Sequence, residues 1–333
     1  MANTQEKNSY LDALLKEMQL KKDYLQETPI RTLYFGGGTP SLLSTDEIER
    51  ILKQLKTCFE LDAIEEITLE ANPEQLSSEY CQKLWNLGIN RLSIGIQSFQ
   101  DHVLRFMGRK HTAEEAMSAV QNAMEAGFQN ISIDLIYGVS ERTDEQWEAD
   151  METAFSLPIQ HLSCYALTPE ENSILYKQIQ NQRHAPVDEE QATRQYQMLI
   201  NAAHRTDLEH YEISNFAKPG FESKHNSSYW NHTPYLGLGP AAHSFNGNSR
   251  QWNPSNLHQY IKNISENVGH EDMEELSDTD LFNETILLSL RTSKGLDLRL
   301  VSAKYGKKQF FQLERPPRQG RRRNAERNQQ RRR

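Results

Sequence analysis

The sequence is poor in cysteine, and its cysteines are far apart. Among 333 residues only Cys58, Cys81 and Cys164 carry thiols, and their spacing matches no CxxC or CxxxCxxC ligand set. Cys58 and Cys81 lie among apolar neighbours in segments with helical character, where buried structural thiols are common. We therefore predict three structural thiols and, from this sequence, no thiolate set that holds a metal cluster.

The sequence also lacks long apolar runs and a positive net charge. No segment approaches the roughly 18–20 apolar residues that cross a bilayer, and the polar start MANTQEKNSY is unlike a signal peptide. The formal net charge of −9 argues against a nucleic-acid-binding surface over the body of the protein. We expect a soluble, cytoplasmic protein with no specific nucleic-acid partner.

Residues 314–333 differ from the rest of the chain, because they contain nine arginines against two glutamates. Such a segment cannot bury a core, so we predict a disordered basic tail. A tail of this kind leaves open a peripheral contact with an acidic membrane surface or with RNA. The abrupt change after the ordinary sequence KYGKKQFFQL favours a C-terminus that is not native.

The middle of the chain repeats a short apolar strand, a polar or glycine-rich loop and a helix start such as the capping box at Ser44 to Glu47. This alternation predicts parallel strands joined by right-handed crossovers. We expect strands at 32–35, 66–71, 91–98, 130–138 and 161–167. An α/β fold with an open (β/α)₆ barrel fits this number of strands, and a doubly wound sheet remains the alternative.

The two ends of this pattern suggest domain limits. An amphipathic helix is expected at 8–25 with no strand before it, so we expect an incomplete barrel that has lost its first strand. After about Val187 the pattern changes to that of a smaller α+β C-terminal region, with a helix at 189–205, a strand at 211–214 and a helix at 280–290. We predict a partial barrel at 1–186, an accessory region at 187–313 and the basic tail at 314–333.

Polar residues mark the carboxyl ends of the expected strands, where parallel α/β folds bind ligands. Glu70 and Asp134 stand out, because a charge inside an apolar strand is costly unless it is paired or faces a ligand. A bond to neighbouring backbone, or to a structural arginine such as Arg91 or Arg109, is the alternative. The run Gly36 to Gly38 allows close backbone approach, but it lacks the lysine of a P-loop and the spacing of a Rossmann turn.

Five segments in order resemble one family: YFGGGTPSLL, ITLEANPE, LGINRLSIGIQSF, LRFMGRKH and ISIDLIYGV. They are similar to the oxygen-independent coproporphyrinogen III oxidase-like family of radical S-adenosylmethionine (SAM) proteins. The resemblance implies that the methionine amino end of SAM is held by the glycine-rich loop, with further contacts from the later strands. The implied SAM-binding residues are Gly37, Gly38, Thr39, Glu70, Gln97, Arg109, Asp134 and, through its backbone, Ala166.

A sixth segment resembles one branch of this family. His225 to Trp230 read HNSSYW, which is similar to the HNxxYW signature of the HemW-type heme chaperones. The resemblance implies heme binding with His225 as the iron ligand, and Tyr229 and Trp230 flanking the macrocycle. His232 and His243 compete for the ligand role.

The sequence departs from the family at one point. The family's CxxxCxxC loop, whose thiolates hold a [4Fe–4S] cluster, is missing. We therefore interpret the chain as a truncated member with weak SAM binding and no radical chemistry of its own. Its expected function is to bind heme and transfer it to an unidentified acceptor protein.

The alternatives are a radical SAM coproporphyrinogen III dehydrogenase of porphyrin biosynthesis and a non-functional fragment, so whether the chain is an enzyme stays open. A further expectation concerns assembly: an exposed barrel edge favours a homodimer through strand pairing.

Overall fold

The computed structural model describes residues 4–26, 28–171, 173–268 and 272–306. A seven-stranded sheet with the order β1-β2-β3-β4-β5-β7-β6 forms its centre. The first five strands are parallel, whereas β7 and β6 run antiparallel to the strands beside them. Their bounds are β1 Thr32–Phe35, β2 Glu66–Ala71, β3 Arg91–Gln97, β4 Ile131–Tyr137, β5 His161–Ala166, β6 Glu209–Glu212 and β7 Asn215–Ala217.

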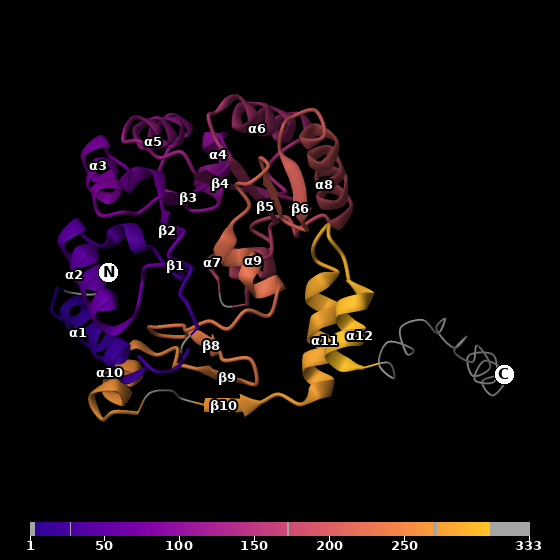
Figure 1. Cartoon of the computed structure of the whole chain (residues 1–333). Coiled ribbons are helices and arrows are strands. Elements are labelled where there is room, and N and C mark those ends of the chain that lie inside the picture. The colour runs from indigo at the N-terminus through magenta and orange to yellow at the C-terminus, as the bar shows by residue number, and fades with distance from the viewer. Residues whose placement is uncertain (1–3, 27, 172, 269–271, 307–333) are drawn as a thin grey trace, which may run out of the picture.

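Helices cover the outer face of this curled sheet (Figure 1). They are α2 Thr45–Cys58, α3 Ser78–Asn86, α4 Asp101–Phe106, α5 Ala113–Glu125, α6 Asp144–Ser156 and α8 Glu189–Ala203, and α7 Ile174–Gln180 follows β5. The predicted capping box at Ser44 and Glu47 is present, as is the one at Thr112 and Glu115. Leu69, Leu92 and Ile133 alternate along their strands with polar residues and pack into the main core.

The alternation leaves the opposite, concave face of the sheet polar. Because side chains point to opposite faces with a period of two, residues such as Glu70, Arg91, Ser93, Asp134 and Ser163 lie on that inner face. The apolar residues between them contact the helices instead. The sheet therefore presents a buried polar lining on the side where no layer of helices covers it.

The strand order decides between the two predicted architectures. A doubly wound sheet reverses its order at a switch point, whereas β1 to β5 follow one another without reversal. The prediction of an open, barrel-type α/β fold is confirmed, with all five expected strands in their expected order. No helix in the described part of the chain is both long and apolar enough to cross a membrane.

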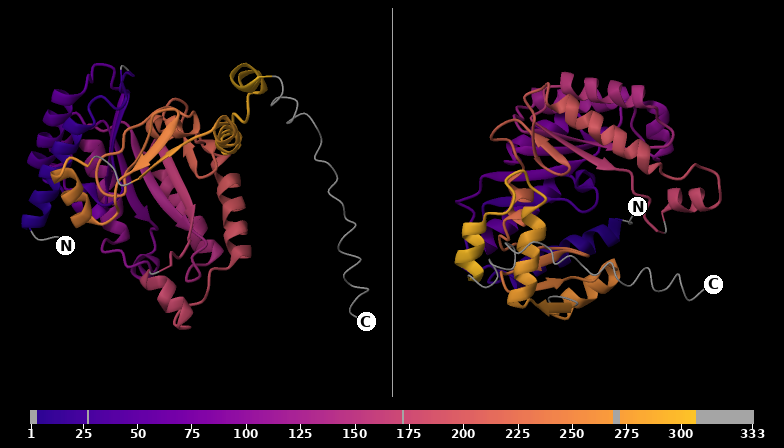
Figure 2. Two further views of the ribbon diagram at one scale, coloured as in Figure 1. Left: turned by 90° about the horizontal axis from the view of Figure 1, so that it is seen from below. Right: turned by 90° about the vertical axis from the view of Figure 1, so that its right-hand side faces the viewer.

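A second, three-stranded antiparallel sheet has the order β10-β9-β8. Its strands are β8 His243–Phe245, β9 Ser249–Trp252 and β10 Asp272–Glu275. The helices of this region are α9 Lys224–Trp230, α10 Leu257–Ser265, α11 Asp278–Ser289 and α12 Leu298–Tyr305. Helix α1 (Thr4–Leu20) packs against both α2 and α10, so it links a helix that covers the large sheet to a helix of the second region (Figure 2).

The structure shifts one predicted boundary. The helix expected at 8–25 is α1, which begins at Thr4 and ends at Leu20. Residues 21–26 form turns with Gln26 in the left-handed region (φ 52°), and Pro29 cannot continue a helix. The residues after Val187 form β6 and β7, which belong to the large sheet, and α8, which packs beside it. They also form the whole of the second sheet. The division at 186/187 stays a prediction, and the basic tail at 314–333 lies outside the described residues.

Candidate functional site: a polar cavity and the helix beside it

A cavity of about 160 Å³ lies at the carboxyl ends of β1 to β4. Six of the nine residues predicted to bind a ligand line it together. They are Gly38, Thr39, Glu70, Gln97, Arg109 and Asp134, and Ala71, Asn72, Ser93 and Gly95 complete the lining. Gly37 lies next to the cavity, whereas Ala166 is exposed at the end of β5 and does not line it. The sixth predicted segment, at His225, is on α9.

Glu70 is fixed at the rim of this cavity by two donors. The Tyr34 hydroxyl donates to its Oε1 at 2.7 Å, and the Gly37 N–H donates to its Oε2 at 3.2 Å. Burial nevertheless raises the pKa of the Glu70 carboxyl. A Cβ at Gly36 would come within 2.8 Å of Oε1, and Gly37 has φ +78°, so glycine is required at both positions.

Asp134 lines the cavity from β4, and Arg109 lines it from the loop between α4 and α5. Burial raises the pKa of Asp134 to about 6, and Ser93 Oγ donates to its Oδ1 at 3.4 Å. Arg109 Nη2 donates to Asn72 Oδ1 and to the Gly95 carbonyl, both at 2.8 Å. The alternative role is present in part: Glu70 accepts from the Gly37 backbone N–H, and the Arg91 charge opposes the effect of burial on the pKa of Asp134, but within the described ranges neither acid forms an ion pair.

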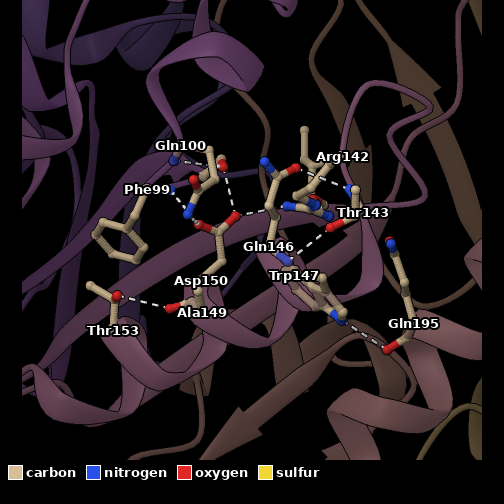
Figure 3. A network of polar contacts seen from close by, with 12 residues as sticks. Phe99, Gln100, Arg142, Thr143, Gln146, Trp147, Ala149, Asp150, Thr153 and Gln195 are labelled. Atoms are coloured by element: carbon tan, nitrogen blue, oxygen red, sulfur yellow. Dashed lines mark hydrogen bonds and ion pairs between the residues drawn. The ribbon is translucent and has the colours of Figure 1, made fainter.

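A buried network holds the end of β3 behind the cavity (Figure 3). Asp150 Oδ1 accepts hydrogen bonds from Phe99 N at 2.9 Å and Gln100 Nε2 at 3.2 Å. Its Oδ2 accepts from Ser98 Oγ at 2.6 Å and from Arg142 Nη1 at 2.9 Å. These bonds fix the residues that directly follow Gln97, whose φ of 74° is left-handed.

This network was not predicted from the sequence. Its signal was Asp150 on the inward side of an otherwise apolar helix face, one turn after the buried Trp147.

Helix α9 carries the HNSSYW segment and packs against β1. The carboxylate of Glu66 accepts the N–H groups of Lys224 and His225, both at 3.0 Å, at the first turn of the helix. Both ring nitrogens of His225 are engaged: Nδ1 with Thr32 Oγ1 and Nε2 with the Tyr229 hydroxyl, each at 2.9 Å. Burial, with a smaller effect of the Arg91 charge, lowers the pKa of His225 to about 4.

The two competing histidines lie in different surroundings. His232 is buried with no hydrogen-bond partner on either ring nitrogen within the described residues, and its Nε2 is 3.7 Å from Glu284. His243 is exposed and stacks on Trp252 with ring centroids 5.9 Å apart. The indole of Trp230 lies under the Arg291 guanidinium at 4.7 Å.

The three cysteines are separated among the helices and the sheet. Cys58 is half-buried in α2, Cys81 is buried in α3, and Cys164 is buried in β5. Burial raises the pKa of Cys81 to about 11 and that of Cys164 well above its ordinary value. Both thiols are therefore protonated near neutral pH, whereas cluster ligands are thiolates.

Comparisons with known proteins place the chain in a family. The model of the radical SAM superfamily matches residues 6–154. The heme chaperone HemW of Bacillus subtilis (strain 168) is 34% identical over 303 residues, which is 90% of this chain and 80% of that protein. HemW of Lactococcus lactis (strain IL1403) is 34% identical over 290 residues, or 87% and 75% of the two chains. The chain belongs to the HemW family of radical SAM proteins.

The resemblance inferred from the sequence segments is thereby confirmed. One solved structure agrees in fold: coproporphyrinogen III oxidase (HemN) from Escherichia coli has a TM-score of 0.80 at 24% identity, covering 91% of this chain and 73% of that one. Because the identity is low, this likeness supports the fold and not the activity. In the HemW family member described here, the segment at 225–230 and the cavity lie on the same half-barrel.

Proposed function

We propose that this chain acts as a heme chaperone, binding heme beside α9 and releasing it to an acceptor protein. One contact carries the proposal: the HNSSYW helix is docked on β1, where the His225 ring stacks on Tyr34 with centroids 4.8 Å apart. Tyr34 is also the donor to Glu70 at the cavity. Tyr34 therefore contacts both the HNSSYW segment and a residue that lines the cavity.

His225 is the iron ligand in this proposal. A histidine ligates heme iron through one ring nitrogen while the other is held by a hydrogen bond. The bond between Nδ1 and Thr32 provides that orientation, and Nε2 would exchange the Tyr229 hydroxyl for iron. The low pKa of His225 keeps the ring neutral near pH 7, which is the state that binds a metal.

The cavity fits SAM by the chemistry of its donors. The carboxylates of Glu70 and Asp134 suit an ammonium group and ribose hydroxyls, and Arg109 suits the methionine carboxylate. SAM, when bound, would supply a sulfonium centre beside the sheet. The residues of this chain would bind and orient it: Arg109 is held by Asn72 and Gly95, and Glu70 by Tyr34 and Gly37.

The cysteines do not fit a [4Fe–4S] cluster. Cys81 and Cys164 are protonated members of the core, and Cys58 belongs to a different helix from Cys81. We therefore propose no radical step for these residues. The proposed function requires heme binding and no radical step.

A hemin titration followed at the Soret band tests the proposal. The wild-type chain is expected to saturate near one heme per chain, and His225→Ala to bind far more weakly. His258→Ala is the matched control, because that side chain is 81% exposed on α10. A wild-type chain without a Soret shift, or a His225→Ala variant equal to the control, would contradict the proposal.

A further inference from the structure

Two buried donors on the concave face have no partner. Arg91 is 1% exposed, its Nε lacks a hydrogen-bond acceptor, and none of its side-chain atoms forms an ion pair within the part of the chain that the structure describes. Thr68 is fully buried, and its Oγ1 also lacks a partner. The two residues are neighbours, because Thr68 pairs with Arg91 in the register of β2 and β3.

These donors lie directly beside the cavity. The next pair on the same face is Glu70 with Ser93, and both residues line the cavity. Residues i and i+2 of a strand, which point to the same face, are roughly 7 Å apart. Thr68 and Arg91 therefore lie one residue pair beyond the cavity lining, toward the amino ends of the strands.

Another buried arginine shows what a structural role requires in this chain. The Arg142 side chain is fully buried, like that of Arg91, and its Nε also lacks a partner. Its Nη1, however, donates to Asp150 at 2.9 Å and its Nη2 to the Ile136 carbonyl at 2.7 Å, whereas within the described residues neither Nη atom of Arg91 forms a hydrogen bond. Its guanidinium also lies 4.4 Å from the centre of the Trp147 ring. A buried guanidinium without such partners is costly unless a ligand provides them.

The acids near Arg91 are committed to other groups. Glu66 accepts the first N–H groups of α9, Glu70 accepts from Tyr34 and Gly37, and Asp134 accepts from Ser93. Their shared presence on this face opposes a doubly charged phosphate. A monoanion with two oxygens suits one guanidinium and one hydroxyl.

We infer that Arg91 and Thr68 form a binding site for the carboxylate of a ligand that occupies the concave face. One carboxylate oxygen accepts from the Arg91 guanidinium and the other from Thr68 Oγ1. The carboxylate comes either from a heme propionate or from a separate small carboxylic acid. The assignment to heme rests on the proposed function, whereas the site itself does not.

Thermal unfolding with sodium propionate as the probe tests the site. Arg91→Met keeps the apolar stem and removes the unpaired charge, so without ligand its Tm should rise by roughly 2–4 °C. Propionate should raise the Tm of the wild-type chain, but not that of Arg91→Met. Propionamide and sodium chloride at matched concentration should have no such effect.

A lower Tm for Arg91→Met together with no effect of propionate on the wild type would overturn the inference. Thr68→Val provides a second variant that keeps the charge and removes only the hydroxyl. It should fold as the wild type does and respond less to propionate. If propionate raised the Tm of Thr68→Val and Arg91→Met as much as that of the wild type, the inference would also be overturned.

Hemin and hemin dimethyl ester identify the source of the carboxylate. If it is a heme propionate, the wild-type chain should prefer hemin by about tenfold or more, and Arg91→Met should lose this preference. Equal binding of both compounds, with the propionate effect retained, assigns the site to a separate carboxylic acid. A rise in Tm with propionate but no Soret shift with hemin would support the carboxylate site and contradict heme binding.

Discussion

Tyr34 joins His225 to Glu70 on the concave face of the sheet. Its ring stacks on the imidazole at 4.8 Å with an interplanar angle of 21°, and its hydroxyl donates to Glu70 Oε1 at 2.7 Å. Tyr34 belongs to β1, whereas His225 lies on a helix 191 residues later in the chain. A change at the cavity can therefore reach the HNSSYW helix through one side chain.

Tyr34→Phe separates these two roles, because it keeps the stacked ring and removes the donor. We expect a loss of about 1–2 kcal/mol in the free energy of unfolding, since Glu70 loses a hydrogen bond. Urea unfolding measures it. Tyr24→Phe is the control, because the buried Tyr24 hydroxyl has no partner within the described ranges. Equal stabilities of the two variants would contradict the role of Tyr34.

Asp150→Asn should destabilise the protein strongly. The substitution leaves Arg142 buried without its counter-ion, which typically costs about 3–5 kcal/mol. Asp12→Asn removes an exposed partner of Arg50 and should change stability by less than about 1 kcal/mol. Urea unfolding of both variants checks the prediction, and a loss below about 1 kcal/mol for Asp150→Asn would contradict it.

His225 should make stability depend on pH in the acid range. Its folded pKa of about 4 lies below the ordinary value of 6.5, so the unfolded chain binds more protons between these values. The contribution of neutral His225 to the free energy of unfolding is fully present above pH 6.5 and is lost as the pH falls toward 4. Asp134, whose pKa is raised to about 6, acts in the opposite direction, since its raised pKa favours the folded state at low pH.

The difference between the wild-type chain and His225→Gln isolates the histidine. Between pH 7 and pH 5 the wild type should lose about 1–2 kcal/mol more than the variant. Chemical unfolding at the two pH values measures this difference. Parallel pH profiles for the two proteins would show that His225 is not buried in its neutral form.

Asp134→Asn should gain stability and lose ligand binding. At pH 8 the ionised Asp134 carboxylate is held in a buried setting that raises its pKa to about 6, so its neutral replacement should stabilise the chain by about 1 kcal/mol. Equilibrium dialysis should show SAM retained by the wild type and by the exposed control Asp62→Asn, and weakened for Asp134→Asn. If Asp134→Asn bound SAM as tightly as the wild type, Asp134 would not be a SAM-binding residue.

The sequence predicted what depends on local patterns. The strands at Thr32, Glu66, Arg91, Ile131 and His161 follow from apolar runs, and the helix starts follow from capping boxes. Glu70 and Gln97 were predicted from their places at strand ends, Asp134 from its charge inside an apolar strand, and Arg109 only from the family resemblance. These signals lie within a few residues of one another, so one chain suffices to read them.

The contacts between segments that are distant in the sequence could not be predicted from local patterns. No local pattern places His225 on Thr32 or the N–H groups of α9 on Glu66. The alternative in which Arg91 pairs with Glu70 or Asp134 is not seen as an ion pair within the described residues, although the Arg91 charge opposes the burial that raises the pKa of Asp134. Only the packed structure shows which buried charges have partners.

Imidazole rescue of His225→Ala tests whether His225 is the heme ligand. The variant should bind hemin weakly, with a Soret band unlike that of the wild type. Added imidazole should restore the wild-type band, because it supplies the missing nitrogen in the space left by the side chain. His258→Ala should need no rescue. A His225→Ala variant with the wild-type band before imidazole is added, or an unchanged altered band after it, would show that His225 is not the heme ligand.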